Sequence, residues 1–269
     1  MTDGRGPNRR EGPGAGRYPG WRPIVALALV APSIPGLLTG STPVSRLLFD
    51  PVGFLLSFLG LVALYGGGAL LIREFRARRG GGWTTVLLLG AAYGIVEEGF
   101  AVHTFFAPGG APVFAFATYG QWAGVDWLWA LGLTVFHSVY SIALPILIVD
   151  LWFPESRDAP WLGRVGVGLT AAAYLGIVAL FARVVGHGPT PAAFGFFLAL
   201  AVGLVGWAAL APPGLLSPRP GRARASSWVI GAAAALPFTI WTLLLLQSER
   251  PLLSASAAAV PTLLAGATG

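Results

Sequence analysis

The sequence predicts an all-α fold, a polytopic transmembrane helical bundle of seven or eight spans. Hydrophobic residues make up 55% of the 269 residues and charged residues only 10%, whereas soluble domains carry about 25% charged residues. Several apolar runs approach or exceed the length of about 20 residues that a helix needs to cross a bilayer. These two observations indicate a membrane protein and exclude the usual soluble globular class.

The first 22 residues differ in composition from the rest of the chain. They are rich in glycine, proline and arginine and have no apolar periodicity, which predicts a disordered cytoplasmic tail at residues 1–22. Residues 23–269 are expected to form a single transmembrane helical domain. A signal peptide is the competing interpretation, but the basic region is long and no small-residue cleavage site stands out, so an uncleaved first span is favoured.

Apolar runs give the order of the expected spans. They cover residues 23–40, 51–72, 83–106, 127–149, 165–185, 193–211 and 228–246, and a weaker alanine-rich run at 251–268 is the eighth candidate. Three consecutive glycines, Gly66 to Gly68, lie inside the second run, and Gly90 and Gly94 lie inside the third. Glycines let neighbouring membrane helices approach closely, so we expect tight helix contacts at both places.

The segment between the third and fourth spans is too apolar for an ordinary external loop. Residues 107–125 contain no charge, many aromatic side chains, and both glycine and proline. We expect an apolar segment on the outer side of the membrane that is interfacial or re-entrant, since irregular backbone is tolerated at membrane depth where it lines a protein cavity. An aromatic belt at the level of the lipid headgroups is the alternative, and it stays open.

The distribution of arginine predicts the orientation. All 17 basic residues are arginine, and a cytoplasmic N-terminus places fourteen of them inside and three outside, namely Arg46, Arg183 and Arg250. This asymmetry is typical of a multi-pass protein of a prokaryotic cell membrane whose N-terminus is cytoplasmic. It also accounts for the net charge of +6 without a nucleic-acid partner. Membrane lipid is the expected partner, together with a membrane-bound peptide or protein if the chain is a hydrolase.

Two adjacent acids and a histidine interrupt the apolar runs. Glu97 and Glu98 lie about 21 Å along the third span if it begins at Trp83, and His137 lies about 16 Å along the fourth, which runs the opposite way. The acids and the imidazole are therefore expected at a similar depth, in the outer half of the membrane. This coincidence on neighbouring spans is the main functional signal in the sequence.

Helical phase refines this site. Gly90, Gly94 and Glu98 recur at the i, i+4, i+8 spacing of one helix face, so we expect Glu98 to face a closely packed neighbour and to be the critical acid. Glu97 points about 100° away, on the stripe of Tyr93.

The fourth span is expected to carry a polar stripe. Ser141 follows His137 by one turn, and Asp126 lies three turns before His137 on nearly the same face. Asp126, His137 and Ser141 would line one wall of the site, and the glutamate pair would supply the facing wall.

Such a cluster supports several kinds of chemistry. Two adjacent carboxylates in a low-dielectric site are not both ionised easily, and they titrate as a pair. A neighbouring imidazole can orient a water or exchange a proton with them, which serves general acid–base hydrolysis. Cation binding and proton relay are equally compatible, and a satisfied polar contact between helices is the bland alternative.

Two further histidines are supporting candidates. His103 is about 140° away from Glu98 on a regular helix, and His187 lies in a Gly- and Pro-rich stretch at the outer boundary, so ordinary interfacial roles compete for both. The sequence establishes no cofactor, but a divalent metal such as zinc takes three protein ligands, which Glu98, His137 and His187 could supply. No HExxH spacing is present, and the absence of cysteine excludes thiolate ligands.

The order of these elements resembles the CAAX protease and bacteriocin-processing family of intramembrane proteases, also called the abortive-infection family. Those proteins carry a Glu-Glu motif (EExxxR), then FxxxH, then HxxxN or HxxxD, on separate helices. Glu97 and Glu98 match the first motif and His137 the second, while His187 matches the third by order alone. The resemblance, which covers about residues 90–190, implies a water activated by glutamate with histidines that assist or hold a metal.

The sequence departs from all three motifs. Val102 stands at the arginine position of the first motif, Leu133 at the phenylalanine of the second, and Pro191 at the amide or acid of the third. An alternative register takes His137 and Ser141 as a degenerate third motif.

Three functions follow as hypotheses. The favoured one is a membrane-embedded, protease-like hydrolase that uses Glu97, Glu98 and His137 to activate water. The alternative is a non-enzymatic transporter or a proton- or cation-binding membrane protein with the same acids. The third is a scaffold whose polar core is inert.

Overall fold

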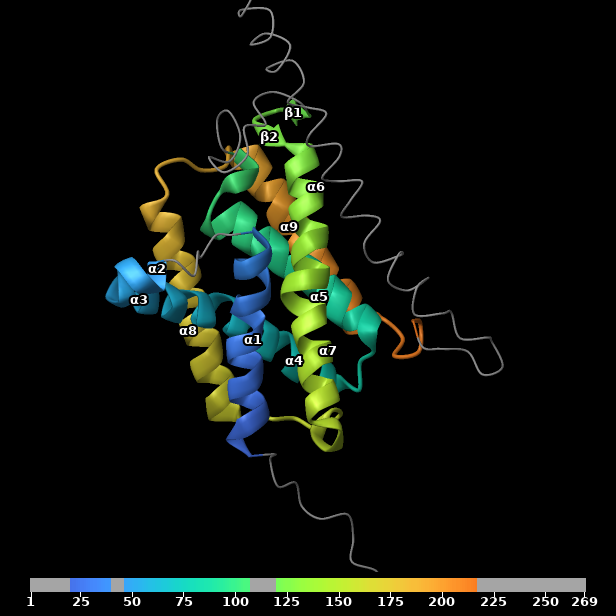
Figure 1. Ribbon diagram of the computed structural model, residues 1–269. Helices are drawn as coiled ribbons and strands as arrows, with labels where there is room; N and C mark the ends of the chain where they lie inside the picture. The colour runs from blue at the N-terminus through green and yellow to red at the C-terminus, as the bar shows by residue number, and fades with distance from the viewer. Residues whose placement is uncertain (1–19, 40–45, 107–119, 217–269) are drawn as a thin grey trace, which may run out of the picture.

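The computed structural model describes residues 20–39, 46–106 and 120–216, and Figure 1 shows them as closely packed helices with a short hairpin at one end. The helices are α1 (Trp21–Thr39), α2 (Arg46–Phe49), α3 (Pro51–Leu61), α4 (Gly67–Arg79), α5 (Trp83–Ile95), α6 (Trp127–Phe136), α7 (Leu144–Trp152), α8 (Arg164–Val184) and α9 (Pro191–Leu210). Strands β1 (Gln121–Trp122) and β2 (Val125–Asp126) pair antiparallel, with Gln121 opposite Asp126 and Trp122 opposite Val125.

Shorter helical segments join several of these helices. Three are π-helical: η1 (Val62–Gly66) continues α3 into α4, η2 (Val96–Ala101) continues α5, and η4 (His137–Ala143) continues α6 into α7. Two are 3₁₀ turns, η3 (Thr104–Phe106) and η5 (Pro154–Ser156). The predicted runs at 51–72 and 127–149 therefore lie in continuous helices whose winding changes part-way, and the run at 83–106 is such a helix only as far as Ala101.

Within the described residues, five helical stretches are long and apolar enough to cross a membrane: Pro51–Arg79, Trp83–Ala101, Trp127–Trp152, Arg164–Val184 and Pro191–Leu210. They coincide with five of the predicted runs, and α1 coincides with the run predicted at 23–40. The candidates at 228–246 and 251–268 lie outside the described residues, as do residues 1–19 of the tail predicted at 1–22. The end of that predicted tail is corrected, because Trp21 and Arg22 already belong to α1. The all-α class is confirmed for the described part, and the total of seven or eight spans stays a prediction.

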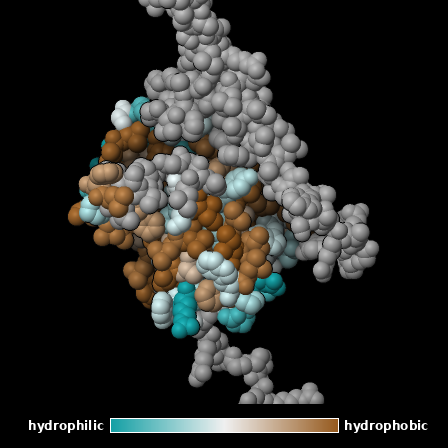
Figure 2. Space-filling view, viewed as in Figure 1, coloured by the Kyte–Doolittle hydropathy of each residue, from teal (hydrophilic) through white to brown (hydrophobic). Residues whose placement is uncertain are grey.

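The surface of the described part is largely apolar. Helix α8 has no buried residue, and leucines such as Leu169 and Leu175 are more than half exposed. Figure 2 shows apolar residues across the described part of one face, with hydrophilic residues gathered at its lower end. Side chains of this kind are expected on helices that contact lipid.

Glycines set the closest helix contacts, as the sequence predicts. A Cβ at Gly66 would lie 2.7 Å from the carbonyl oxygen of Ala28 in α1, and a Cβ at Gly68 would overlap the ring of Tyr93 in α5. Cβ atoms at Gly90 and Gly94 would lie 2.9 Å from Ser138 Cα and 3.0 Å from His137 Cβ. The glycine face of α5 therefore packs directly on the helix that carries His137.

The hairpin replaces the last part of the predicted apolar outer segment. Residues 107–119 lie outside the described residues, whereas Gly120 to Asp126 form the turn and strands that lead into α6. Gly120 and Gly124 have φ values of 82° and 76°, and the exposed Trp122 ring stacks near Trp127. The hairpin lies beside the first residues of α6, at the end of the bundle away from the first residues of α1 and α8 (Figure 1).

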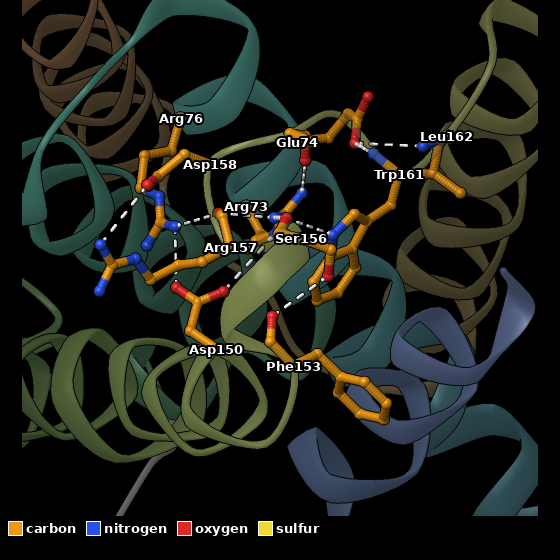
Figure 3. A network of polar contacts seen from close by, with 11 residues as sticks. Arg73, Glu74, Arg76, Asp150, Phe153, Ser156, Arg157, Asp158, Trp161 and Leu162 are labelled. Atoms are coloured by element: carbon orange, nitrogen blue, oxygen red, sulfur yellow. Dashed lines mark hydrogen bonds and ion pairs between the residues drawn. The ribbon is translucent and has the colours of Figure 1, made fainter. Parts of the chain in front are cut away.

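At the end of the bundle away from the hairpin, buried arginine side chains of α4 bind the loop between α7 and α8. Arg73 in α4 is fully buried and donates hydrogen bonds to the carbonyls of Ser156 (2.8 Å), Arg157 (2.7 Å) and Ala159 (2.6 Å) in the loop between α7 and α8 (Figure 3). Its guanidinium carbon lies 3.5 Å from the ring centroid of Trp161.

Carboxylates complete this arginine network. Glu74 accepts the backbone N–H of Trp161 at 2.9 Å, and Asp150 of α7 lies 2.8 Å from Arg76 Nη2 and 3.8 Å from Arg73 Nε (Figure 3). Helix α4 is thus joined to α7 and the loop that follows it, which are distant from α4 in sequence, at one end of the molecule.

Candidate functional site

The acid pair and His137 form one buried cluster. His137 Nε2 lies 2.8 Å from Glu98 Oε1, and His137 Nδ1 lies 3.1 Å from Glu97 Oε2. Glu97, Glu98 and His137 are 3%, 8% and 2% exposed, so the whole group is shielded from the surface. The contact between Glu98 and His137 is the one that helical phase predicts, and Glu97 joins it although a regular helix would turn it away.

The winding of the helices explains why both acids reach the same ring. A π-helical turn holds more residues than an α-turn, so the angle between successive side chains is smaller and the phase of a regular α-helix no longer applies. Glu97 and Glu98 lie in η2, and His137 is the first residue of η4. The close approach of Gly94 to His137 then brings the two π-helical segments together.

Hydroxyl groups hold Glu98 and His137 in place. Thr104 Oγ1, from the turn that follows η2, donates a short hydrogen bond to Glu98 Oε2. Ser141 Oγ lies 2.9 Å from His137 Nδ1, as expected for a residue one turn further along. Because Nδ1 carries one proton at most, Ser141 and Glu97 compete for it. Glu98 has a hydrogen-bond partner on each oxygen, Thr104 on Oε2 and His137 on Oε1.

Tyrosines surround Glu97. The hydroxyl of Tyr65 in η1 lies beside the Glu97 carboxyl, and the Tyr65 ring packs on His137, with ring centroids 6.0 Å apart. Tyr93 also directs its hydroxyl toward Glu97, and its ring contacts those of Tyr65 and Tyr174. Tyr93 Oη and Glu97 Oε2 are buried without a completed hydrogen bond to any described residue. The Glu97 Oε2 contact with His137 Nδ1 is therefore an ion-pair contact without hydrogen-bond geometry.

The cluster has a surplus of negative charge when both acids are ionised. Among the described residues, the ion pairs of Glu97 and Glu98 are both with His137, which supplies one positive charge at most. One additional proton or one bound cation would neutralise the group. Burial makes this neutralisation strongly favourable, because isolated charges in a low-dielectric site are costly.

The donor atoms fit a divalent metal such as zinc. Glu97, Glu98 and His137 each offer one ligand atom, and these atoms lie within 4.8 Å of one another. Catalytic zinc sites have three protein ligands, and carboxylate oxygens and imidazole nitrogens are both zinc ligands, so this set is chemically suitable. The proposed ligand set is therefore corrected in one position, since Glu97 takes the place expected for His187.

His187 and His103 contact each other and not the cluster. His103 Nδ1 lies 2.5 Å from the carbonyl oxygen of His187, and their ring centroids are 6.2 Å apart. His103 has a φ of 56°, in the left-handed region that side chains rarely adopt, and this turn aims its ring toward the 187–188 loop. Neither histidine belongs to the described group of metal-ligating side chains.

Asp126 is also separate from the cluster, so the expected wall of Asp126, His137 and Ser141 holds for His137 and Ser141 and is wrong for Asp126. Asp126 caps the start of α6, where its Oδ1 accepts the backbone N–H of Trp129 at 3.0 Å. Burial raises the pKa of this carboxyl above its usual value. An acid that directly precedes a helix satisfies the helix's free N–H groups, and that local role explains its position.

Sequence reasoning missed Tyr65 and Thr104. Tyr65 directly precedes the three glycines, but no spacing rule connects it to an acid on another helix. Thr104 follows Glu98 by six positions, a separation that brings two side chains together only because the chain turns sharply at His103.

Comparison with known proteins assigns a family to this fold and site. A family model described as an uncharacterized membrane protein family matches residues 25–263, which include every residue of the cluster. The chain belongs to this family. The family name and the apolar helices together establish a membrane protein. No match to the CAAX protease family was found, so that resemblance is unconfirmed, and no curated protein or solved structure matches this family member.

Proposed function

We propose that this protein is a protease-like intramembrane hydrolase in which the glutamate pair and His137 activate water. The observation that supports this proposal is the contact of one imidazole with both carboxylates in a buried cluster, at 2.8 and 3.1 Å. An acid–base pair within hydrogen-bonding reach is the geometric requirement for general acid–base catalysis.

The two glutamates take different parts in this mechanism. Glu98 is held by Thr104 and His137, so it fixes the orientation of the imidazole. Glu97 Oε2 lies 3.1 Å from His137 Nδ1 without a completed hydrogen bond, and it accepts a proton from water as the water oxygen attacks the scissile carbonyl. The proton then passes, directly or through His137, to the leaving nitrogen as the C–N bond breaks. The substrate class is a membrane-bound peptide or protein.

A divalent metal is compatible with this mechanism. Glu97, Glu98 and His137 would hold it, and it would supply Lewis-acid polarisation of the carbonyl. Thr104 and Ser141 keep the ligand side chains oriented in either case, because each hydrogen bonds to one of them.

A second candidate function is a transporter or a proton- or cation-binding protein. The surplus negative charge of the cluster favours it, since a single cation or proton neutralises the site. Such a protein would bind and release the ion reversibly and would catalyse no reaction.

The orientation belongs to the same proposal. We infer a multi-pass protein with a cytoplasmic N-terminus, because fourteen of the 17 arginines then lie inside. In the described part, the arginine end of α4, the loop after α7 and the start of α8 meet at one end of the bundle, which supports a cytoplasmic end of this composition.

Isosteric variants of the acids test the proposed function. Glu97→Gln and Glu98→Gln keep side-chain volume, but the amide does not take up a proton. In proteoliposomes that contain native membrane proteins, new N-termini counted by mass spectrometry should fall about 10²–10⁴-fold for at least one variant. The exposed Glu155→Gln variant is the matched control and should cleave like the wild type.

The competing functions give different outcomes. A transporter shows no new N-termini with any protein, and the same two variants change uptake driven by a proton or cation gradient. A scaffold responds in neither assay. If both glutamine variants cleave at the wild-type rate, the hydrolase proposal is wrong.

A further inference from the structure

A second feature, on the far side of Tyr93 from Glu97, is an apolar cavity. It has a volume of about 380 Å³ and lies between α4, α5, α8 and α9. This volume is within the range of about 300–1,000 Å³ that is usual for small-molecule sites. Its floor is buried, with Leu89, Ala92 and Tyr93 each less than a tenth exposed.

The cavity opens sideways, not toward either end of the bundle. Its rim includes Leu198, Val202 and Val205 of α9, which are 44%, 62% and 43% exposed. These residues belong to a helix apolar enough to span a membrane, and α8 beside it has no buried residue. The opening therefore faces the hydrocarbon region of the bilayer.

The lining restricts the kind of occupant. Only apolar atoms of the protein line the cavity surface, so no group there can accept or donate a hydrogen bond. An extended peptide segment would leave its backbone N–H and C=O groups unpaired in this space, at several kcal/mol for each group. A hydrocarbon chain has no such groups, and it is the material that surrounds the opening.

The inner wall joins this cavity to the polar cluster. Tyr93 and Tyr174 line the cavity with their ring carbons, and the Tyr93 hydroxyl points the other way, toward Glu97. Gly68 leaves room for the Tyr93 ring, because any Cβ there would overlap it. A chain in the cavity would consequently lie one aromatic ring away from the acid pair.

We propose that this cavity is a binding site for one acyl chain of a membrane phospholipid, which enters laterally over α9 and rests on Tyr93 and Tyr174. The site is a binding site in its own right, and it holds whether or not the glutamate pair performs hydrolysis. An acyl chain in the cavity would pack against the rings of Tyr93 and Tyr174, and the hydroxyl of Tyr93 lies on the side of Glu97.

Photolabelling in nanodiscs tests this inference. The probe is phosphatidylcholine with a diazirine on its acyl chain, and labelled peptides are mapped by mass spectrometry. We expect labelling of the wild type to concentrate on residues 89–96 and 198–205, above the level on the exposed face of α6. Val202→Trp at the rim should lower cavity labelling about tenfold, because the larger side chain blocks the opening.

A matched variant separates blocking from general effects of the substitution. Val135 is a 46% exposed valine on α6 that does not line the cavity, so Val135→Trp should label like the wild type. Glu97→Gln should also label normally, which keeps this result independent of hydrolysis. Labelling of the cavity no stronger than of α6, as expected if part of the chain itself fills the space, overturns the inference. So does equal labelling in the Val202→Trp variant.

Discussion

At the scale of single residues, the two adjacent glutamates are not equivalent. Glu98 has a partner on each oxygen, His137 on one and Thr104 on the other, whereas Glu97 keeps an oxygen without a completed hydrogen bond. The expectation that Glu98 is the critical acid rests on its helix face, and the structure indicates that this face serves to hold His137. Which of the two acids is critical stays a prediction for the glutamine variants to decide.

Removal of the Thr104 hydroxyl should destabilise the protein. Thr104→Val keeps the shape of the side chain but leaves Glu98 Oε2 buried without its donor, which costs about 1–3 kcal/mol. Thermal unfolding in detergent measures this loss, and Thr104→Ser, which keeps the hydroxyl, should restore most of the stability. Equal stability of the valine variant and the wild type would show that the hydrogen bond is dispensable.

Zinc binding should depend on His137 and not on His187. Because Glu97, Glu98 and His137 offer three ligand atoms within 4.8 Å of one another, added Zn²⁺ is expected to stabilise the protein against thermal unfolding. The stabilisation should disappear in His137→Ala and persist in His187→Ala and His103→Ala. A loss in the His187 variant would favour the ligand set that the sequence resemblance implies.

At the scale of helices, the winding decides which side chains meet. Regular 3.6-residue periodicity correctly predicts that Gly90, Gly94 and Glu98 face a neighbour, and that neighbour carries His137. The same periodicity turns Glu97 away, and this prediction fails because Glu97 lies in a π-helical segment. Hydropathy does not reveal a π-turn, since one added residue leaves the apolar character of a run unchanged.

Three helices become π-helical where they meet, and each contributes to the cluster. Tyr65 comes from η1, the glutamates from η2, and His137 and Ser141 from η4. Such segments are rare and occur frequently at functional sites. Their coincidence around one cluster is a structural reason, independent of sequence motifs, to place function here.

The contact between α5 and η4 should be intolerant of a single methyl group. In Gly90→Ala the new Cβ would lie 2.9 Å from the backbone of Ser138, so the helices must separate, at a cost of about 1–3 kcal/mol. Gly176→Ala in α8 is the control, because a Cβ there meets nothing within 4 Å and alanine favours a helix by about 1 kcal/mol. Thermal unfolding should rank the alanine variant at residue 90 below the wild type and the control at or above it.

At the scale of the whole molecule, the two ends differ in chemistry. One end carries the arginine network of α4 and the loop after α7, and the other carries the β1–β2 hairpin with its exposed Trp122 (Figures 1 and 3). The apolar runs predicted the described helices well, because length and hydropathy decide which segments enter a membrane. The partners of the buried arginines were not predictable, since most are backbone carbonyls of a loop.

Cysteine labelling should distinguish the two ends in intact cells. The chain has no cysteine, so single substitutions at the exposed Gln121 and Asp158 give clean signals. A membrane-impermeant maleimide is expected to label Gln121→Cys from outside and to label Asp158→Cys only after lysis. The reverse pattern would overturn the cytoplasmic assignment of the N-terminus.

The buried arginine of α4 has a consequence for the order of biosynthesis. The carbonyls that Arg73 contacts are translated 83 to 86 residues after it, a delay of roughly 4–17 s at about 5–20 residues per second. During that interval the end of this span carries charges without their partners, and an arginine inside the bilayer costs about 2.5–3.5 kcal/mol. Until α7 and the following loop have been synthesised, the charged end of the newly inserted helix therefore stays at the membrane surface, where water can hydrogen bond to Arg73.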